Sequence, residues 1–267
     1  MESKKAKSLI ANTASELIVS QAVRNSSVGA ISSSFVPKFH PVQRQTIQNM
    51  IYESLKDAIM KGQIAPGTKL EVNELANRFG TSPMPVREAL SRLVESGALV
   101  TQPNKSVSMP LLKSHDLVEL GRIRMTIEGM AGLWAAEHVT DEEIKLMEGY
   151  CDQLVECIRQ KDKSQAAEVN EKIHFAIYAA TRFEKLIPIV ERLWMQNGPY
   201  FSLLSWDVFR SGDRLHRKMI EGLKNRNGLA VQKAIETDIF DALNSLLNVP
   251  LSDDIRPTVL LKIGSEV

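Results

Sequence analysis

The sequence contains little cysteine and no long apolar run, and each absence excludes a class of protein. Its only cysteines, Cys151 and Cys157, lie six residues apart in a helical pattern, which places them on different helix faces and matches no metal or redox motif. No apolar run approaches the roughly 18 residues of a membrane-spanning helix. Polar residues interrupt residues 1–23 too often for a secretory signal. We therefore expect a cytoplasmic protein with free thiols and no membrane partner.

Charge is unevenly distributed, although the formal net charge of the 267 residues is only +1. Residues 38–110 carry nine Lys and Arg against six Asp and Glu, whereas residues 111–267 carry 20 against 24. A small positive surplus is common on protein surfaces, so the positions of the charges have to decide whether the first segment binds nucleic acid. The shift in charge does predict a division of the chain near residue 110.

Composition and pattern predict four segments. Residues 1–42 are rich in Ser, Ala, Asn and Val without a sustained period, and they are predicted to form a flexible N-terminal tail. Residues 43–111 and 112–250 are predicted to be two folded domains, because a hydrophobic content of 43% suffices for a substantial core. Residues 251–267 are predicted to be a C-terminal tail.

Residues 43–111 begin with two helical patterns. In QTIQNMIYESLKDAIMKG a helix that stops at Gly62 is predicted by apolar residues at steps of four, namely Ile47, Ile51, Leu55 and Ile59. EVNELANRFG repeats the pattern at shorter length, with an inward face formed by Val72, Leu75, Ala76 and Phe79. The two segments predict a helix followed by a second, short helix.

A third helix and a hairpin complete the pattern. In TSPMPVREALSRL, Ser82 can cap the helix and the two prolines suit its first turn, while Arg87 and Arg92 lie outside the apolar stripe. GALVTQPNKSVSMPLL then reads as two short strands around a Pro-Asn-Lys-Ser turn. This order predicts a winged helix-turn-helix. Such a module places its third helix in the DNA major groove, where an arginine can pair with guanine O6 and N7 or hold a phosphate.

Residues 43–111 resemble the DNA-binding domain of the GntR family of bacterial transcription regulators. The segments that match are AIMKGQIAPGTKL, NELANRFGTS, PVREALSRL and the short wing after GALV. The resemblance implies DNA contacts from Asn73, Ser82, Arg87, Lys105 and Ser106. The family commonly has arginine where Pro83 stands and glycine where Ser106 stands, which implies a missing base contact and a different wing tip. The alternative for Arg87 is an ordinary exposed charge paired with Glu88 or Glu95.

Beyond residue 112 the sequence shows one helical pattern after another and no alternating strand pattern. Ser114 opens the first helix, and Thr140 with Glu143 forms a capping box for the second. Further helices are expected at about 165–181, 184–208, 211–226 and 228–248. The short connections predict an antiparallel all-α bundle, so the predicted fold class of the whole chain is mainly α.

Several polar residues of this bundle occupy inward positions. Asp238 lies in the apolar stripe of the last helix, and His216 lies in the stripe of the helix before it. Asn170 and His174, four residues apart, share one face of an earlier helix. Two imidazoles and a carboxylate suit a divalent transition metal such as zinc or nickel, with the Asn170 oxygen or water completing the shell. The alternative is that each is a core polar residue satisfied by its neighbours.

Residues 115–250 resemble the effector-binding FCD domain of the FadR-type GntR regulators, in the segments RIRMTIEGMAGLWAAEHVTDEEI, NEKIHFAIYAAT and LHRKMIEGLKNRNGLAVQKAIETDIFDAL. The resemblance implies a metal site in which His174 and His216 match family ligands. Asn170 stands in place of an aspartate and Asp238 in place of a histidine. Zinc, nickel or manganese is the implied metal.

The same resemblance implies that Arg124 and Glu128 line the effector cavity. Arg124 would then meet the carboxylate of a small organic acid. Because the two residues lie one helical turn apart, an ordinary intrahelical salt bridge is the alternative.

These features predict a transcription regulator with a winged helix in front and a helical effector domain behind. We expect it to bind double-stranded operator DNA as a homodimer, because two related half-sites call for two recognition helices. Two alternatives stay open: a metal-dependent hydrolase that uses residues 170, 174, 216 and 238, and an acyl-CoA-responsive regulator without a metal. No nucleophile or general-base motif accompanies those four residues.

Overall fold

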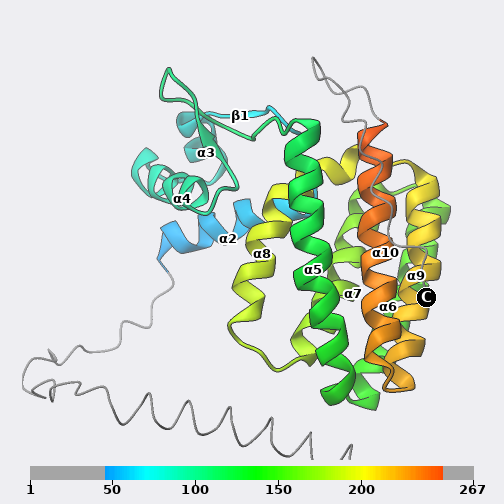
Figure 1. Cartoon of the computed structure of the whole chain (residues 1–267). Coiled ribbons are helices and arrows are strands. Elements are labelled where there is room, and N and C mark those ends of the chain that lie inside the picture. Colours follow the sequence, from blue (N-terminus) through cyan, green and yellow to red (C-terminus); the bar gives the residue numbers. More distant parts are fainter. Residues whose placement is uncertain (1–45, 249–267) are drawn as a thin grey trace, which may run out of the picture. The chain divides into compact units, whose positions relative to one another are not determined.

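The computed structural model describes residues 46–248, so the predicted tails 1–42 and 251–267 lie outside the described residues. The described part consists mainly of helices, with three short strands near its beginning (Figure 1). In chain order the elements are α2 Ile47–Met60, β1 Lys69–Leu70, α3 Val72–Arg78, α4 Pro83–Glu95, β2 Val100–Thr101, β3 Val107–Ser108, α5 Ser114–His138, α6 Asp141–Gln160, α7 Lys163–Ala180, α8 Leu186–Asn197, the 3-10 helix η2 Gly198–Leu203, α9 Trp206–Lys224 and α10 Gly228–Leu247. This architecture confirms the predicted fold class. No helix within residues 46–248 combines the length and the apolar character needed to cross a bilayer.

The three strands form one antiparallel sheet in the order β1-β3-β2. Val107 of β3 pairs with Leu70 of β1 on one side and with Thr101 of β2 on the other. The hairpin of β2 and β3 is the predicted wing. The sequence pattern does not predict β1, because a strand of two residues is too short to show alternation. The wing is therefore anchored by a strand that directly precedes α3.

Helices α2 and α4 pack through their predicted apolar faces. The buried residues of these faces are Ile51, Leu55 and Ile59 of α2 and Val86, Ala89, Leu90 and Leu93 of α4. Two residues predicted to face inward do not, because Ile47 is 59% exposed and Phe79 is 36% exposed. Ile47 is the first residue of α2 and Phe79 follows the last residue of α3, so both lie at helix ends, beyond the turns that form the core.

Arg92 of α4 holds that helix against α2. Its Nη1 donates to Asn49 Oδ1 at 3.0 Å, and its guanidinium carbon lies 3.9 Å from the centre of the Tyr52 ring. Both partners belong to α2, so a hydrogen bond and a cation–π contact join the two helices. The Arg92 side chain is therefore occupied by contacts within the winged-helix module, whereas Arg87 on the same helix is exposed.

Helices α5 and α10 run side by side through the bundle (Figure 1). They approach closely at glycines of α5: a Cβ on Gly132 would lie 2.5 Å from Ile235 Cδ1, and one on Gly121 would lie 2.8 Å from Leu243 Cδ2. Side chains at these two positions would displace α10, because packed interiors leave no spare volume. Since α10 carries Asp238, the small residues of α5 help to set the position of that carboxylate.

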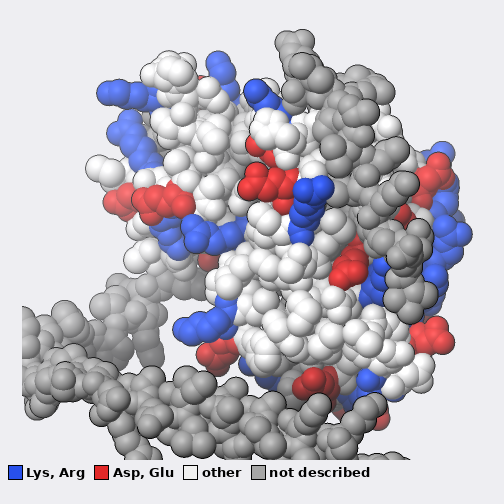
Figure 2. Space-filling view, viewed as in Figure 1, with Lys and Arg blue, Asp and Glu red and all other residues white. Residues whose placement is uncertain are grey.

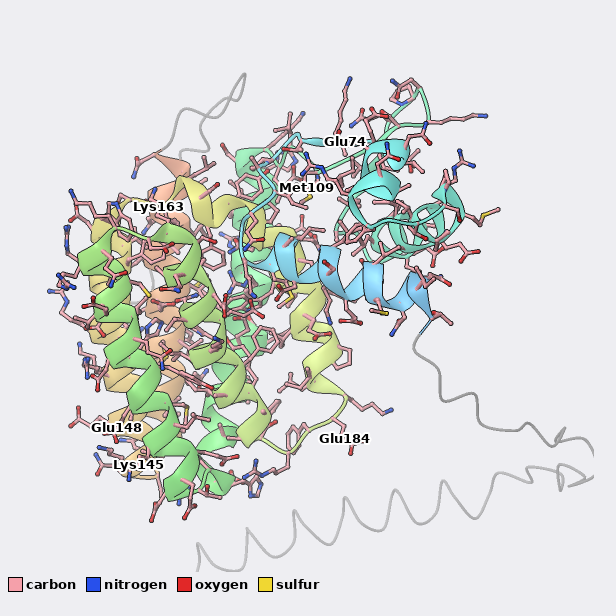
Figure 3. All side chains as sticks on the ribbon, turned by 180° about the vertical axis from the view of Figure 1, so that it is seen from behind. Glu74, Met109, Lys145, Glu148, Lys163 and Glu184 are labelled. Carbon is pink, nitrogen blue, oxygen red and sulfur yellow. The ribbon has the colours of Figure 1, made fainter. Side chains whose placement is uncertain are left out.

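The local helix signals of the bundle are found as predicted. α5 begins at Ser114, and Thr140 and Glu143 form the capping box of α6, with Glu143 N donating to Thr140 Oγ1 at 3.2 Å and Thr140 N donating to Glu143 Oε2 at 2.9 Å. Lys145 and Glu148 lie on the outer surface of α6, where Glu148 pairs with Lys224 of α9 (Figure 3). Both cysteines of α6 are free and buried, although their spacing predicts different helix faces.

The helix predicted over 184–208 is interrupted, so that prediction is wrong. α8 ends at Asn197, η2 spans Gly198–Leu203, and α9 begins at Trp206 instead of the predicted 211. Pro199 has no N–H to donate to the carbonyl four residues before it. Gly198 lies against the end of α2, where a Cβ would fall 2.4 Å from Ile59 O. The chain therefore turns at the point where it meets α2.

Acidic residues of α7 face α2. Glu168 pairs with Lys61, whose Nζ lies 3.2 Å from Oε2. Glu171 lies one turn further along, and its Oε2 is buried and accepts no hydrogen bond from any residue within 46–248. Burial and the negative charge of Asp57 raise the pKa of Glu171 to about 7, even though nearby lysines oppose the shift. Glu171 therefore titrates near neutral pH.

We expect stability to depend on pH through Glu171. Because folding raises its pKa above the ordinary value of 4.5, the folded protein binds more protons than the unfolded chain between these two pKa values. This contribution to the free energy of unfolding should be fully present below about pH 4.5 and should be lost as pH rises through about 7. Replacing Glu171 with Gln should remove this loss and stabilise the protein at about pH 8 by about 1 kcal/mol, a figure reduced for partial exposure.

Urea unfolding of the wild type and of Glu171→Gln, at about pH 5 and about pH 8, measures this difference. Glu168→Gln is the control, because Lys172 and Lys61 lower the pKa of Glu168 and its carboxylate is favourable when charged. That variant should lose stability at the higher pH. An identical pH dependence of unfolding in the wild type and Glu171→Gln would contradict the assignment.

Candidate functional site

The first turns of α3 and α4 form the candidate DNA-reading surface. Asn73, Ser82 and Arg87 are all exposed there, and Lys and Arg side chains project from the winged-helix module into solvent (Figure 2). Ser82 occupies the N-cap position of α4, but its hydroxyl makes no capping hydrogen bond, so the predicted cap is absent. Among residues 46–248, Arg87 pairs with neither Glu88 nor Glu95. Its guanidinium is therefore free to meet a partner outside the chain.

The wing tip is held by an asparagine. Asn104 Oδ1 accepts a hydrogen bond from Ser106 N at 3.1 Å and another from Ser106 Oγ at 2.7 Å. Lys105, between them, has a φ of 65°, the left-handed conformation that glycine adopts most easily. The position of unusual backbone conformation is therefore Lys105 and not Ser106. Lys105 is exposed at the tip, while the hydroxyl of Ser106 is already engaged.

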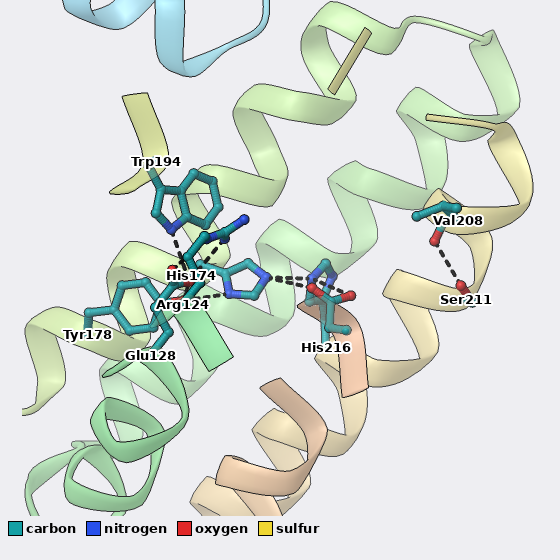
Figure 4. A network of polar contacts seen from close by, with 9 residues as sticks. Arg124, Glu128, His174, Tyr178, Trp194, Val208, Ser211 and His216 are labelled. Carbon is teal, nitrogen blue, oxygen red and sulfur yellow. Dashed lines mark hydrogen bonds and ion pairs between the residues drawn. The ribbon is translucent and has the colours of Figure 1, made fainter. Parts of the chain in front are cut away.

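Three helices bring the predicted metal-site residues His174, His216 and Asp238 together (Figure 4). The two Nε2 atoms lie 3.2 Å apart, and His174 Nε2 lies 3.2 Å from Asp238 Oδ2. His216 Nε2 lies 4.0 Å from Asp238 Oδ1. The imidazole side chains are 1% exposed and the carboxylate is 16% exposed. Residues far apart in the sequence thus converge on one interior point.

The cluster borders a cavity of about 30 Å³, which has room for one or two water molecules. Asn170 lines this cavity one helical turn before His174, so all four residues of the predicted metal site surround the same space. Arg124 lines it as well, from α5. The predicted metal-site residues and Arg124 therefore belong to one site.

A buried carboxylate lies beside the cluster. Glu128 is fully buried, and it accepts two hydrogen bonds from Arg124, at 2.7 Å from Nε and 3.1 Å from Nη2. The intrahelical salt bridge between Arg124 and Glu128, which the sequence offered as an alternative, is thus present. It lies in the interior and not on the surface. Two residues that the sequence analysis missed complete the shell: Tyr178 Oη donates to Glu128 Oε2 at 2.6 Å, and Trp194 Nε1 donates to the same oxygen at 3.0 Å.

The sequence offers a signal for only one of these two residues. Tyr178 lies four residues after His174 and therefore shares its helical face, and its hydroxyl lies 2.9 Å from His174 Nδ1. Trp194 lies on α8, and nothing in its local sequence distinguishes it from an ordinary core aromatic. The Trp194 ring lies 5.4 Å from the His174 ring and 5.0 Å from the Arg124 guanidinium carbon.

Burial and charge set the protonation of the cluster. Burial lowers the pKa of His216 to about 4, despite the nearby charge of Asp238, so its imidazole is neutral at pH 7. Burial by itself raises the pKa of Asp238, but the contact with His174 and the positive charge of Arg124 leave that pKa below its ordinary value. Burial and the charge of Glu128 raise the pKa of Tyr178 well above its usual range, so its phenol keeps its proton.

The donor set fits a divalent transition metal. Two nitrogens bound tetrahedrally at 2.0–2.1 Å lie about 3.3 Å apart, close to the separation of the two Nε2 atoms. The neutral imidazole of His216 and the ionised carboxylate of Asp238 are in the forms that bind metal. His216 Nδ1 is buried and finds no hydrogen-bond partner within the described part of the chain.

Two family descriptions match the chain: "Bacterial regulatory proteins, gntR family" over residues 47–108 and "FCD domain" over residues 119–240. The HTH-type transcriptional regulator McbR of Escherichia coli K12 is 32% identical over 149 residues, which are 56% of this chain and 67% of McbR. The HTH-type transcriptional repressor RspR of the same organism is 25% identical over 215 residues, which are 77% of this chain and 91% of RspR.

Solved structures agree with the sequence matches. The structure titled E. coli McbR/YncC aligns with a TM-score of 0.71 at 25% identity and covers 76% of this chain and 98% of that chain. A putative transcriptional regulator GntR from Rhodococcus sp. RHA1 has the same fold, with a TM-score of 0.63 at 20% identity over 76% of this chain and 98% of that chain. The chain therefore belongs to the GntR family of bacterial transcription regulators and combines a helix-turn-helix DNA-binding domain with a FadR-type FCD domain.

Proposed function

We propose that this regulator reads operator DNA as a homodimer and that its FCD domain binds a small organic acid together with a divalent metal. The observation that supports the proposal most strongly is the convergence of His174, His216, Asp238 and Arg124 on one buried cavity, in a chain that also carries an exposed Arg87 on its recognition helix. A regulator acting on operator DNA would work in the cytoplasm.

Arg87 is the proposed base-reading residue. It is exposed on α4 and has no partner among residues 46–248, so it can enter the major groove without breaking a contact. Asn73, Ser82, Lys105 and Ser106 are proposed to hold phosphates or sugars around it. Pro83, where the family commonly has arginine, leaves Arg87 as the arginine of this turn.

A dimer is proposed because operator half-sites are read in pairs. Uncharged atoms make up most of the surface in the lower centre of Figure 2, below the charged groups that lie over the upper part of α5. Helices α5 and α8 carry apolar side chains that are unusually exposed, with Ile123 of α5 at 40% and Ile189 of α8 at 49%. An apolar, uncharged face of this kind suits contact with a second copy of the chain.

A metal is proposed because the cluster has too few N–H hydrogens for every close contact between its nitrogen and oxygen atoms to be a hydrogen bond. Asp238 presents carboxylate oxygens to both imidazoles, and the two Nε2 atoms face each other at 3.2 Å. Lone pairs that meet in a buried site repel one another unless a cation lies between them. His174, His216 and Asp238 would hold zinc, nickel or manganese, with the Asn170 oxygen or water as a further ligand. The metal would supply a Lewis-acidic position for a carboxylate.

Arg124 is the proposed partner of the organic acid. Its salt bridge with Glu128 uses Nε and Nη2, and the side chain also lines the cavity, so its remaining terminal nitrogen can pair with a ligand carboxylate. A cavity of about 30 Å³ holds no organic acid in the conformation described. Binding would therefore have to move at least one of the surrounding helices.

Helix α8 is the element best placed to transmit such a movement. One face of α8 carries Trp194, which donates to Glu128 beside the cavity. Other contacts of the same helix reach the winged-helix module: Glu191 lies 3.1 Å from Lys56 Nζ on α2, and Arg192 Nη2 donates to Glu95 O at the end of α4 at 3.1 Å. A shift of α8 would thus change the position of the recognition helix α4.

The two alternatives receive less support. The hydrolase reading lacks a nucleophile or general base beside the four residues, and the relatives described above are named as transcription regulators. An acyl-CoA-responsive regulator without metal would need a long apolar cavity, whereas the space at the cluster is small and bordered by imidazoles and a carboxylate.

Replacing Arg87 with Ala should weaken operator binding by about 1–3 kcal/mol, because a bidentate contact to guanine is lost. Gel-shift titration on an operator mapped from genomic binding sites, with random DNA in parallel, measures the effect. Arg210→Ala, which removes an exposed arginine from α9, is the control and should bind normally. Equal losses on operator and random DNA would make Arg87 a phosphate contact, and unchanged affinity would remove it from the reading surface.

A chelator should lower the melting temperature of the protein, and added zinc, nickel or manganese should restore it. The reason is that metal binding to the folded state alone stabilises that state by RT ln(1 + [L]/Kd). His216→Ala should abolish the response, while His138→Ala, which changes a half-exposed histidine of α5, should retain it. The metal proposal fails if the purified protein contains no metal and neither chelator nor metal moves the melting temperature.

Arg192→Ala should uncouple the two domains. We expect operator affinity to differ between zinc-loaded and chelated wild type, with a coupling free energy of about 1–3 kcal/mol. The variant should take up zinc normally but should show a smaller difference, because the hydrogen bond from α8 to Glu95 is lost. Arg159→Ala on α6, which removes an exposed arginine, is the control. An undiminished difference in Arg192→Ala would exclude this contact as the route.

A further inference from the structure

The hydroxyl of Tyr178 lies between a buried anion and a proposed metal ligand. Its oxygen is 2.6 Å from Glu128 Oε2 and 2.9 Å from His174 Nδ1 (Figure 4). Tyr178 is fully buried, and Glu128 and His174 are 0% and 1% exposed. Water therefore has little access to any of the three groups, and their hydrogen bonds must be satisfied by one another.

The direction of these hydrogen bonds follows from counting protons. The Glu128 carboxylate forms a salt bridge with Arg124 and also accepts from Trp194, so it acts here as an acceptor. The single phenol proton of Tyr178 must then point to Glu128. The Tyr178 oxygen can only accept from His174, which requires a proton on His174 Nδ1.

We propose that Tyr178 is the positioning residue that sets the tautomer of His174, with Nδ1 protonated and the Nε2 lone pair directed toward His216 and Asp238. A neutral imidazole binds metal through the nitrogen that carries no proton, and the partner of its other nitrogen decides which one that is. This inference rests on the proposed metal site and adds a residue outside the ligand set. Glu128 fixes Tyr178, and Tyr178 fixes His174.

Tyr178→Phe removes one oxygen and keeps the ring, so it tests the hydroxyl alone. In a competition titration against a zinc chelator, this variant should bind zinc about 10–100-fold more weakly than wild type, the usual effect of losing an outer partner of a metal-bound histidine. Tyr200→Phe is the matched control. It also removes a buried tyrosine hydroxyl, but one that accepts from Leu112 N and donates to Pro110 O, away from the cluster. Equal zinc affinities in wild type and both variants would overturn the proposal.

A second measurement does not depend on metal binding. Long-range ¹H–¹⁵N spectra of histidine show which ring nitrogens carry protons, and we expect His174 Nδ1 to be protonated in metal-free wild type at about pH 7.5. In Tyr178→Phe the Nε2-protonated tautomer should become populated, while Tyr200→Phe should match the wild type. An unprotonated Nδ1 in the wild type would overturn the proposal whether or not zinc binds. If wild type takes up no zinc but Nδ1 is protonated as expected, the metal proposal fails and the role of Tyr178 stands.

Discussion

The FCD domain depends on how one buried carboxylate is satisfied. Glu128 has no solvent exposure, and an ionised carboxylate in that position is strongly unfavourable unless several donors surround it. The donors come from three helices: Arg124 from its own helix α5, Tyr178 from α7 and Trp194 from α8. Because each hydrogen bond allows only a narrow range of distance and angle, Glu128 fixes the relative position of these helices. A small displacement of α7 or α8 would remove one of the donors to this buried carboxylate and leave it less well satisfied.

This constraint links the interior site to the DNA-binding module. Trp194 ties α8 to Glu128, and within the same helix Glu191 and Arg192 contact α2 and the end of α4. The helix is short, because Gly198 and Pro199 end it where the chain meets α2. The contacts of this one helix therefore reach both the interior site and the winged-helix module. The proposed ligand response of the regulator therefore depends on the same contacts that stabilise the domain.

Helix packing places a carboxylate from α10 in the cluster, at a position where the family resemblance implies a histidine. The resemblance also implies an aspartate where Asn170 stands on α7, and in this chain Asp238 supplies a carboxylate from α10. Two imidazoles and one carboxylate still converge. The close approach of α5 and α10 at Gly121 and Gly132 allows α10 to present that carboxylate to His174.

The sequence by itself determined the helices, the wing and the inward placement of His174, His216 and Asp238, because periodicity and caps are local properties of the chain. The end of the helix predicted over 184–208, the strand β1, and the partners of Arg92 were decided only by tertiary structure, since each depends on residues distant in sequence. The same holds for the site. Local pattern placed Arg124 beside Glu128 one turn along a helix, but only packing buried the pair and brought Trp194 to it, because a hydrogen bond between helices leaves no trace in the periodicity of either.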